Sequence, residues 1–140
     1  MDLTSAVEGF VHEPTQTEGR GLDLTVAAVE KLTAPGQVDF GGGELAAVET
    51  VRLAPEKRDA GDDYGWWHLD AGQYLLAYNE TLDAEEPIHL QPRTELLDRG
   101  ATHPTLRVTE LPHVPLSVGG AGIEMKENAR VSTLLVSPGR

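Results

Sequence analysis

Short apolar stretches separated by proline and glycine dominate the chain, and long helical periodicity is scarce. Such stretches, bounded by turn residues, are typical of β-strands. We predict strands at 22–29, 66–70, 73–79, 86–92, 104–111, 114–119 and 129–136. Short strands at regular spacing predict an all-β sandwich or barrel. The apolar alternation over 73–78 is imperfect, which indicates a strand with both faces covered.

One short helix is predicted in "PRTELLDRGA" (92–101). Thr94 is placed to cap it, Leu96 and Leu97 to turn inward, and Gly100 to take the left-handed conformation that ends helices. A helix start offers free N–H groups to a phosphate, and Arg93 adds a planar guanidinium suited to the same anion. The residues alone leave two interpretations open, a phosphate site and an ordinary capped surface turn.

The other segments favour one domain over 1–140. "FGGGE" (40–44) is predicted to be a flexible turn, since no helix with Lys-Ser/Thr follows to make it a P-loop. The polar segment 54–65 is predicted to be a loop excursion, not a domain boundary. No repeat of fixed period is present.

The net charge of the chain disfavours two classes of partner. Eleven basic and 23 acidic residues give a net charge of −12, which disfavours nucleic acid and anionic membranes as partners. Because the acids are dispersed along the chain, we favour a solvated surface adapted to a high-salt cytoplasm over an acidic site for a cationic partner. No apolar run of membrane-spanning length and no basic signal-like start is present, so a soluble cytoplasmic protein is expected.

Common catalytic and metal motifs are absent. The chain has no cysteine, no HExxH and no GxSxG, and no two histidines have the i, i+4 spacing of a shared metal ion. A structural zinc site and a serine triad are therefore disfavoured. The pair Trp66-Trp67 lacks the basic groove of a base-stacking site, so we expect one tryptophan in the core and one at an interface.

Four segments, taken in order, resemble the superfamily of deoxyuridine triphosphatases (dUTPases) and dCTP deaminases, especially its archaeal branch. "GLDLTV" (21–26) is similar to an early Asp-Leu-Thr strand, and "WHLDAGQYLLAYNE" (67–80) to a Trp-x-Leu-x-x-Gly-x-Tyr segment that ends in Asn-Glu. "PRTELLDRGATHPT" (92–105) is similar to the helix motif Pro-Arg-Ser-Ser-Leu-Leu-Arg-x-Gly-Ala-Thr. "GIEMKENARVSTLLV" (122–136) is similar to the terminal strand pair.

The resemblance implies a distorted jelly-roll-like domain (a β-clip) that forms a homotrimer with active sites between subunits. It implies hydrolysis of dUTP to dUMP and pyrophosphate with Mg²⁺, or deamination of dCTP. Arg93 and Thr94 fall on phosphate-binding positions. Asp23 falls on a catalytic aspartate that helps order the metal and water.

The chain departs from the superfamily pattern at the residues that serve the chemistry. Glu95 replaces the second serine of the helix motif, and Asp98 replaces a residue that is often basic. Thr109 stands where the family hairpin carries an aspartate, and Glu110 follows it. A shift of one residue turns a strand side chain to the opposite face, so Glu110 serves as the catalytic carboxylate only if a bulge re-aims it.

These departures leave two functional hypotheses. The first is a dUTP diphosphatase with an altered active site, in which Arg93 and Thr94 bind phosphate, Asp23 organises the metal and Glu110 activates water. The second is a non-catalytic paralogue that keeps the trimeric scaffold as a nucleotide-binding, regulatory or assembly module. Deamination of dCTP is less favoured, since the sequence offers no clear position for a buried acid–base glutamate.

Overall fold

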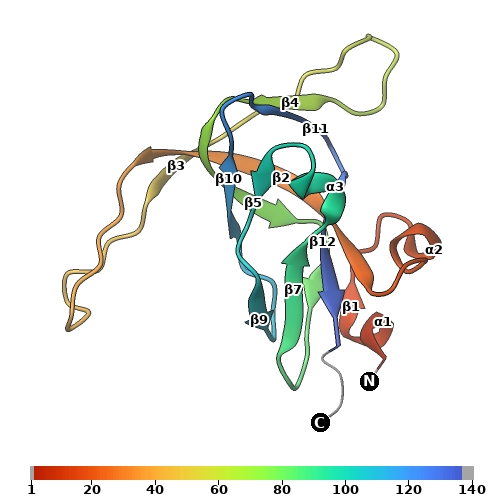
Figure 1. Cartoon of the computed structure of the whole chain (residues 1–140), viewed down its shortest axis with the longest axis horizontal. Helices are drawn as coiled ribbons and strands as arrows, with labels where there is room; N and C mark the ends of the chain where they lie inside the picture. Colours follow the sequence, from red (N-terminus) through yellow and green to blue (C-terminus); the bar gives the residue numbers. More distant parts are fainter. Residues whose placement is uncertain (1, 137–140) are drawn as a thin grey trace.

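The computed structural model describes residues 2–136, and its architecture is mostly β. An antiparallel sheet of eight strands has the order β8-β10-β5-β2-β12-β7-β9, with β3 paired to β2, and it curls around the core (Figure 1). These strands are β2 (Leu22–Ala34), β3 (Glu49–Arg52), β5 (Gly72–Tyr78), β7 (Ile88–Pro92), β8 (Ala101–Thr102), β9 (Leu106–Val108), β10 (Val114–Val118) and β12 (Arg130–Leu135). Two smaller sheets pair β1 (Val7–Glu8) with β6 (Thr81–Leu82) and β4 (Trp66–Leu69) with β11 (Ile123–Lys126).

Each of the seven predicted strands overlaps an observed strand, but the one predicted at 104–111 is reduced to β9, so Thr109 and Glu110 lie outside it. The burial of the strands explains why they form. In β10, Val114, Leu116 and Val118 are buried while Pro115 is exposed, which is the alternation of a sheet with one covered face. By contrast, β2 lies at the centre of the sheet and its first five residues are all buried. Polar side chains of β2 are therefore carried into the core, where they require partners.

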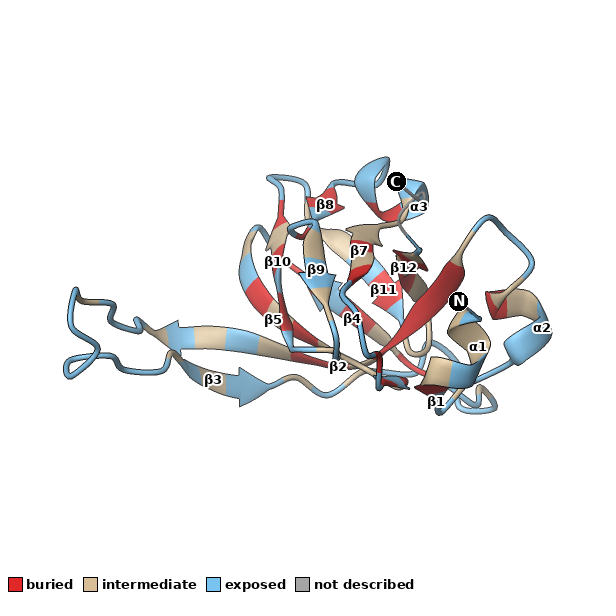
Figure 2. Cartoon of the chain, turned by 90° about the horizontal axis from the view of Figure 1, so that it is seen from below, coloured by how far each residue is buried: buried red, intermediate tan, exposed pale blue. Residues whose placement is uncertain are grey.

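The strand β2 runs to Ala34, five residues past its predicted end at 29. Its second half leaves the body of the sheet and pairs with β3, so that the two strands form a projecting arm (Figures 1 and 2). At the tip, the Asp39 carboxylate accepts hydrogen bonds from the backbone N–H groups of Gly42 (3.0 Å) and Glu44 (2.9 Å). The turn predicted at 40–44 is thus confirmed, and it is an organised turn.

The sheet of β4 and β11 gives the two tryptophans different environments. Trp67 is buried and its indole Nε1 donates a hydrogen bond to the carbonyl oxygen of Leu53 at 3.0 Å, which confirms the prediction of one core tryptophan. Trp66 is half-buried, and the Arg58 guanidinium lies 3.5 Å from its ring centroid. This cation–π contact ties the predicted loop at 54–65 to the sheet.

The short helix predicted in 92–101 is confirmed as α3 (Thr94–Leu97), but the expected number of one is wrong, because the described residues also contain α1 (Leu3–Ala6) and α2 (Glu13–Gln16). Asp2 caps α1, and a proline lies in the first turn of α2. These signals were present in the sequence, but a four-residue helix is too short to show an apolar period.

The predicted helix α3 differs in its details from the expectation. Arg93, not Thr94, occupies the N-cap position, and no side chain caps the helix. Leu96 is buried as predicted, whereas Leu97 is exposed, since a single helical turn presents only one such position to the core. Gly100 has a φ of 102°, which confirms the glycine-dependent closing turn. None of the helices in 2–136 is long and apolar enough to cross a bilayer.

Candidate active site

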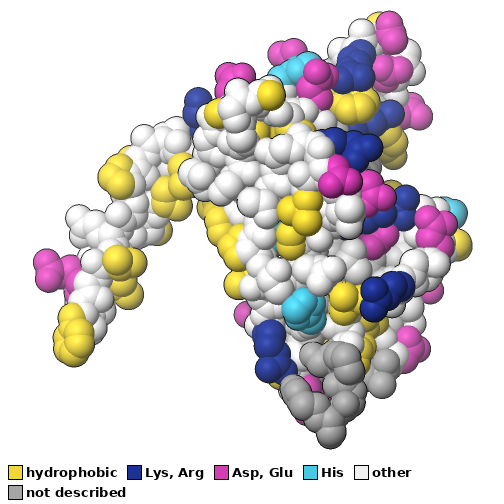
Figure 3. Space-filling model, viewed as in Figure 1, with side chains coloured by type: hydrophobic (Ala, Val, Ile, Leu, Met, Phe, Trp, Pro, Cys, Tyr) yellow, Lys and Arg dark blue, Asp and Glu magenta, His cyan; other side chains and the backbone are white. Residues whose placement is uncertain are grey.

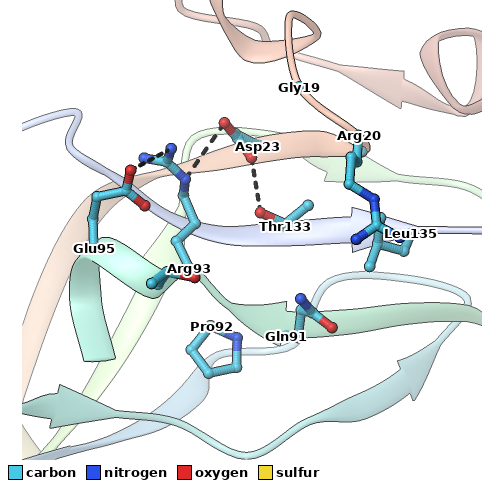
Figure 4. A pocket seen from close by; sticks show the side chains of 11 residues that line it. Gly19, Arg20, Asp23, Gln91, Pro92, Arg93, Glu95, Thr133 and Leu135 are labelled. Carbon is cyan, nitrogen blue, oxygen red and sulfur yellow. Dashed lines mark hydrogen bonds and ion pairs between the residues drawn. The ribbon is translucent and has the colours of Figure 1, made fainter. Parts of the chain in front are cut away.

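Asp23 lies at the centre of an ionic cluster between β2 and β12. Its buried carboxylate accepts a hydrogen bond from the Thr133 hydroxyl on Oδ1 at 2.8 Å and one from Arg130 Nη1 on Oδ2 at 3.1 Å. The Arg93 Nε atom lies 3.5 Å from the same Oδ2 (Figure 4). One buried carboxylate therefore holds two guanidinium groups, which offsets the cost of burying it.

Arg93 stands at the junction of β7 and α3, where the chain is fixed to β12. Its backbone N–H donates to the carbonyl oxygen of Val131 at 3.0 Å. Its side chain is largely buried and bridges two carboxylates, with Nη2 lying 3.3 Å from Glu95 Oε2 (Figure 4). Glu95 is more than half exposed, so this second ion pair is at the surface and readily exchanged.

These side chains face a cleft of about 270 Å³. The cleft is lined by Gly19, Arg20, Gly21, Asp23, Gln91, Pro92, Arg93, Thr94, Glu95, Thr133 and Leu135. Arg20 enters from the loop before β2, across the cleft from Arg93 (Figure 4). That loop runs against β12 at Gly21, where any Cβ would collide with the carbonyl oxygen of Leu134. The two guanidinium groups and the Thr94 hydroxyl are groups that bind anions, and Asp23 and Glu95 give the same lining two carboxylates.

The cleft brings together three of the four residues that the sequence pointed to, namely Asp23, Arg93 and Thr94. The fourth, Glu110, is exposed after β9 and does not line this cleft. The neighbouring Thr109 is also exposed, and its carbonyl oxygen accepts a hydrogen bond from the Ala84 N–H at 3.0 Å. The catalytic role of Glu110 stays a prediction.

The donor set of the cleft does not form a cage for a metal ion. No group of three or more His, Cys, Asp or Glu side chains in 2–136 is arranged to hold one. Asp23 offers one buried carboxylate, and Glu95 adds a second, exposed one at the rim of the same cleft. This set fits Mg²⁺, which proteins commonly bind through one or two carboxylates while water and substrate phosphates supply the other ligands.

A buried glutamate that the sequence reasoning missed supports the site from behind. Glu80 accepts hydrogen bonds from the backbone N–H (2.9 Å) and hydroxyl (2.6 Å) of Thr25 and from Gln16 Nε2 (2.8 Å). The same Gln16 nitrogen donates to the backbone oxygen of Asp23 at 2.9 Å. Glu80 thereby fixes the segment of β2 that carries Asp23, and its signal was the Asn-Glu end of the segment 67–80.

A second buried polar chain crosses the sheet beside the cleft. The Ser132 hydroxyl lies 2.6 Å from the Tyr78 hydroxyl and 2.7 Å from His103 Nε2, while His103 Nδ1 lies 2.9 Å from the carbonyl oxygen of Pro104. Because a carbonyl only accepts, Nδ1 carries the proton and Nε2 accepts from Ser132. Burial lowers the pKa of His103, and burial raises the pKa of Tyr78 to about 12. This chain is therefore uncharged near neutral pH.

Comparison with known proteins identifies relatives of this chain. No protein-family model matches the chain. It is 31% identical over 139 residues to a probable deoxyuridine 5'-triphosphate nucleotidohydrolase of Methanosarcina mazei. The aligned region covers 92% of this chain and 76% of that protein. A protein of the same description from Methanosarcina acetivorans is 30% identical with the same coverage. One from Methanococcoides burtonii is 29% identical over 100 residues, 69% of this chain and 54% of that protein. The matches thus span about half to three quarters of the relatives' own lengths.

Proposed function

The chain belongs to the dUTPase family, and from that premise we propose that it hydrolyses dUTP to dUMP and pyrophosphate. The observation that carries the proposal is the cleft in which Arg93 and Thr94 stand beside the buried Asp23. The arrangement combines a guanidinium for the phosphates with a carboxylate fixed by two strands. We also propose that the chain forms a homotrimer of distorted jelly-roll domains and that it works in a high-salt cytoplasm, as expected from the sequence.

In this reaction the residues of the cleft have separate roles. Arg93 and Arg20 bind the negatively charged phosphate oxygens, and Thr94 donates a hydroxyl hydrogen bond. Arg130 stays on Asp23, where its hydrogen bond of 3.1 Å orients the carboxylate. Thr133 holds the other oxygen, so Asp23 has little freedom to rotate. Positioning of this kind lowers the barrier to phosphate chemistry.

Magnesium, when bound with the nucleotide, would neutralise phosphate charge and polarise the scissile bond. Asp23 is the residue of this chain best placed to hold it, either directly or through a water molecule, and Glu95 is the second candidate. Both oxygens of Asp23 already accept hydrogen bonds. A water-mediated contact therefore keeps the ionic cluster intact.

Water activation is assigned to Glu110 in a neighbouring copy. Glu110 is exposed and lies outside the cleft of its own chain, so it can contribute only if copies assemble with this segment at a neighbour's cleft. A homotrimer with interfacial sites meets that condition.

A non-catalytic paralogue is the second candidate, and a specific contact favours it. The Glu95 carboxylate lies 3.3 Å from Arg93 Nη2, where a phosphate would bind. An internal anion in this position weakens phosphate binding. A protein that uses the trimer only as a binding, regulatory or assembly module would tolerate that loss.

The test is release of pyrophosphate from dUTP and from dCTP in molar KCl with Mg²⁺, together with detection of deaminated nucleotide. The proposal expects turnover of dUTP with dUMP as the product. Deamination of dCTP would assign the other activity of the superfamily. Micromolar binding of a non-hydrolysable dUTP analogue without turnover of either nucleotide would establish the non-catalytic alternative.

A further inference from the structure

The arm formed by residues 31–52 carries an unusual share of exposed apolar side chains. Eight large hydrophobic side chains are exposed in 2–136, and four of them lie in this arm: Val38, Phe40, Leu45 and Val51. Val38 is 92% exposed and Phe40 is 107% exposed, as much as in an extended chain. The arm projects away from the body, and apolar side chains follow it to its tip (Figures 2 and 3).

The tip is organised before any partner covers it. Gln37 and Ala46 exchange two backbone hydrogen bonds of 2.9 and 3.1 Å, and the Asp39 carboxylate caps the turn between them. A preorganised apolar surface loses little conformational entropy on docking. The two ionisable residues of the tip, Asp39 and Glu44, are both acidic.

A cleft with apolar and basic lining residues is formed by α3, β11 and the start of β12. These elements lie away from the arm (Figure 1). We call this cleft the α3–β11 cleft, and its volume is about 200 Å³. Its floor includes the buried side chains of Leu96, Met125 and Val131. Its rim includes three basic residues (Arg99, Lys126 and Arg130) and two acidic ones (Glu95 and Glu124). Arg130 is paired with Asp23 and Glu18, whereas Arg99 and Lys126 form no ion pair within residues 2–136, so these two are the cations available to a partner. Basic and acidic side chains are interspersed over α3, β11 and the adjoining 54–65 loop (Figure 3).

We propose that the arm tip of one copy of this chain docks in the α3–β11 cleft of the next copy. Phe40 fits the apolar floor, and Glu44 approaches the cationic rim at Arg99. In the fold, the tip lies away from α3 and β11 of its own chain (Figure 1). Because the arm and the cleft are different surfaces, the contact is head-to-tail, and such contacts close into rings when the rotation permits.

This inference rests on the self-assembly within the proposed function, and it names the element that holds the assembly. The cleft also shares Glu95 with the candidate active site. Docking of the arm therefore places a neighbouring copy beside the phosphate-binding residues. Assembly and occupancy of the active site are expected to favour each other.

The test is sedimentation of the full chain over a range of concentrations, with circular dichroism to confirm folding. The double variant Val38→Ser/Phe40→Ser is expected to weaken association at least tenfold, as removal of a central apolar contact typically does (about tenfold or more). Val11→Ser is the matched control, because Val11 is an exposed apolar residue outside both the arm and the α3–β11 cleft. It should keep the wild-type mass.

A charge exchange tests where the tip docks. Arg99→Glu alone should weaken association at low salt, and Glu44→Arg in the same chain should restore it. A wild-type chain that stays monomeric, or an arm variant that keeps the full mass, would overturn the inference. If the arm variant forms a smaller assembly but the charge exchange has no effect, the tip docks at another surface, and the inference is overturned as well. Absence of dUTP turnover in an assembled wild type would refute the proposed catalysis alone.

Discussion

Replacement of Glu95 by serine is expected to tighten the binding of a non-hydrolysable dUTP analogue about tenfold at low salt without metal. The Glu95 carboxylate lines the cleft and lies 3.3 Å from Arg93 Nη2. A phosphate at Arg93 must displace this carboxylate and then bind close to it. Serine removes the negative charge and returns a hydroxyl donor to the helix motif.

The magnitude follows from two terms. The pair of Arg93 with Glu95 is at the surface, since the Glu95 side chain is 57% exposed, and such pairs contribute about 0–1 kcal/mol. Two like charges about 5 Å apart in a water-like medium repel by about 1 kcal/mol. Together they amount to about 1–2 kcal/mol, close to a tenfold change in affinity. In molar KCl the Debye length falls to about 3 Å, so the gain should shrink.

Titration calorimetry of the two proteins gives the affinities directly. Glu86→Ser is the matched control, because Glu86 is an exposed acid outside the cleft and its removal changes the net charge equally. Unchanged or weaker binding by Glu95→Ser without metal would refute the reasoning. If Glu95 serves as a magnesium ligand, the substitution strengthens binding without Mg²⁺ and weakens it with Mg²⁺.

Three further predictions concern the proposed catalytic carboxylates and two buried side chains. Asp23→Asn and Glu110→Gln should each abolish turnover of dUTP. Co-assembly of the two variants should restore up to about one quarter of the wild-type turnover, because random mixing leaves some interfacial sites with both carboxylates intact. An inactive mixture would contradict active sites shared between copies. The pKa of His103 is lowered in the folded chain, so below pH 6.5, the ordinary pKa of histidine, the unfolded chain binds a proton more readily than the folded chain. Thermal stability should therefore decline as the pH falls below 6.5. His103→Gln should lack that part of the decline. The raised pKa of Tyr78 predicts stability that is complete below pH 10 and is lost as the pH rises toward about 12. Tyr78→Phe should remove this alkaline loss at a cost of about 1 kcal/mol in the free energy of unfolding, since Ser132 loses one partner; identical alkaline melting profiles of the variant and the wild type would contradict it.

The sequence located the strands because proline and glycine mark their ends, and it misjudged the features that depend on pairing. The segment 30–34 has no strand pattern of its own, and β2 continues through it only because β3 supplies a partner. A four-residue helix is too short to show a helical period of apolar residues, so periodicity does not predict it. The arm therefore had no sequence signal beyond its glycine-rich turn at 40–44.

The candidate site was predictable only in part, for a similar reason. Asp23, Arg93 and Thr94 were found through the resemblance of their local motifs. The contacts that fix them join residues far apart in the chain, such as Thr133 with Asp23 across 110 positions. No local pattern encodes such a contact. The same limit hid the hydrogen bond between Glu80 and Thr25, which supports β2 from the segment between β5 and β6, 55 positions away.

The most direct test of the account is the rate of pyrophosphate release from dUTP by three proteins measured side by side in molar KCl with Mg²⁺. These are the wild type, Arg93→Ala, and Arg107→Ala, whose exposed arginine on β9 lies outside the cleft. We expect dUMP and pyrophosphate from the wild type and from Arg107→Ala, and a loss of at least about 100-fold in Arg93→Ala, because a charged contact to the phosphates is removed. Equal rates for Arg93→Ala and the wild type, or no rate above buffer for any of the three, would contradict the assignment of this cleft to dUTP hydrolysis.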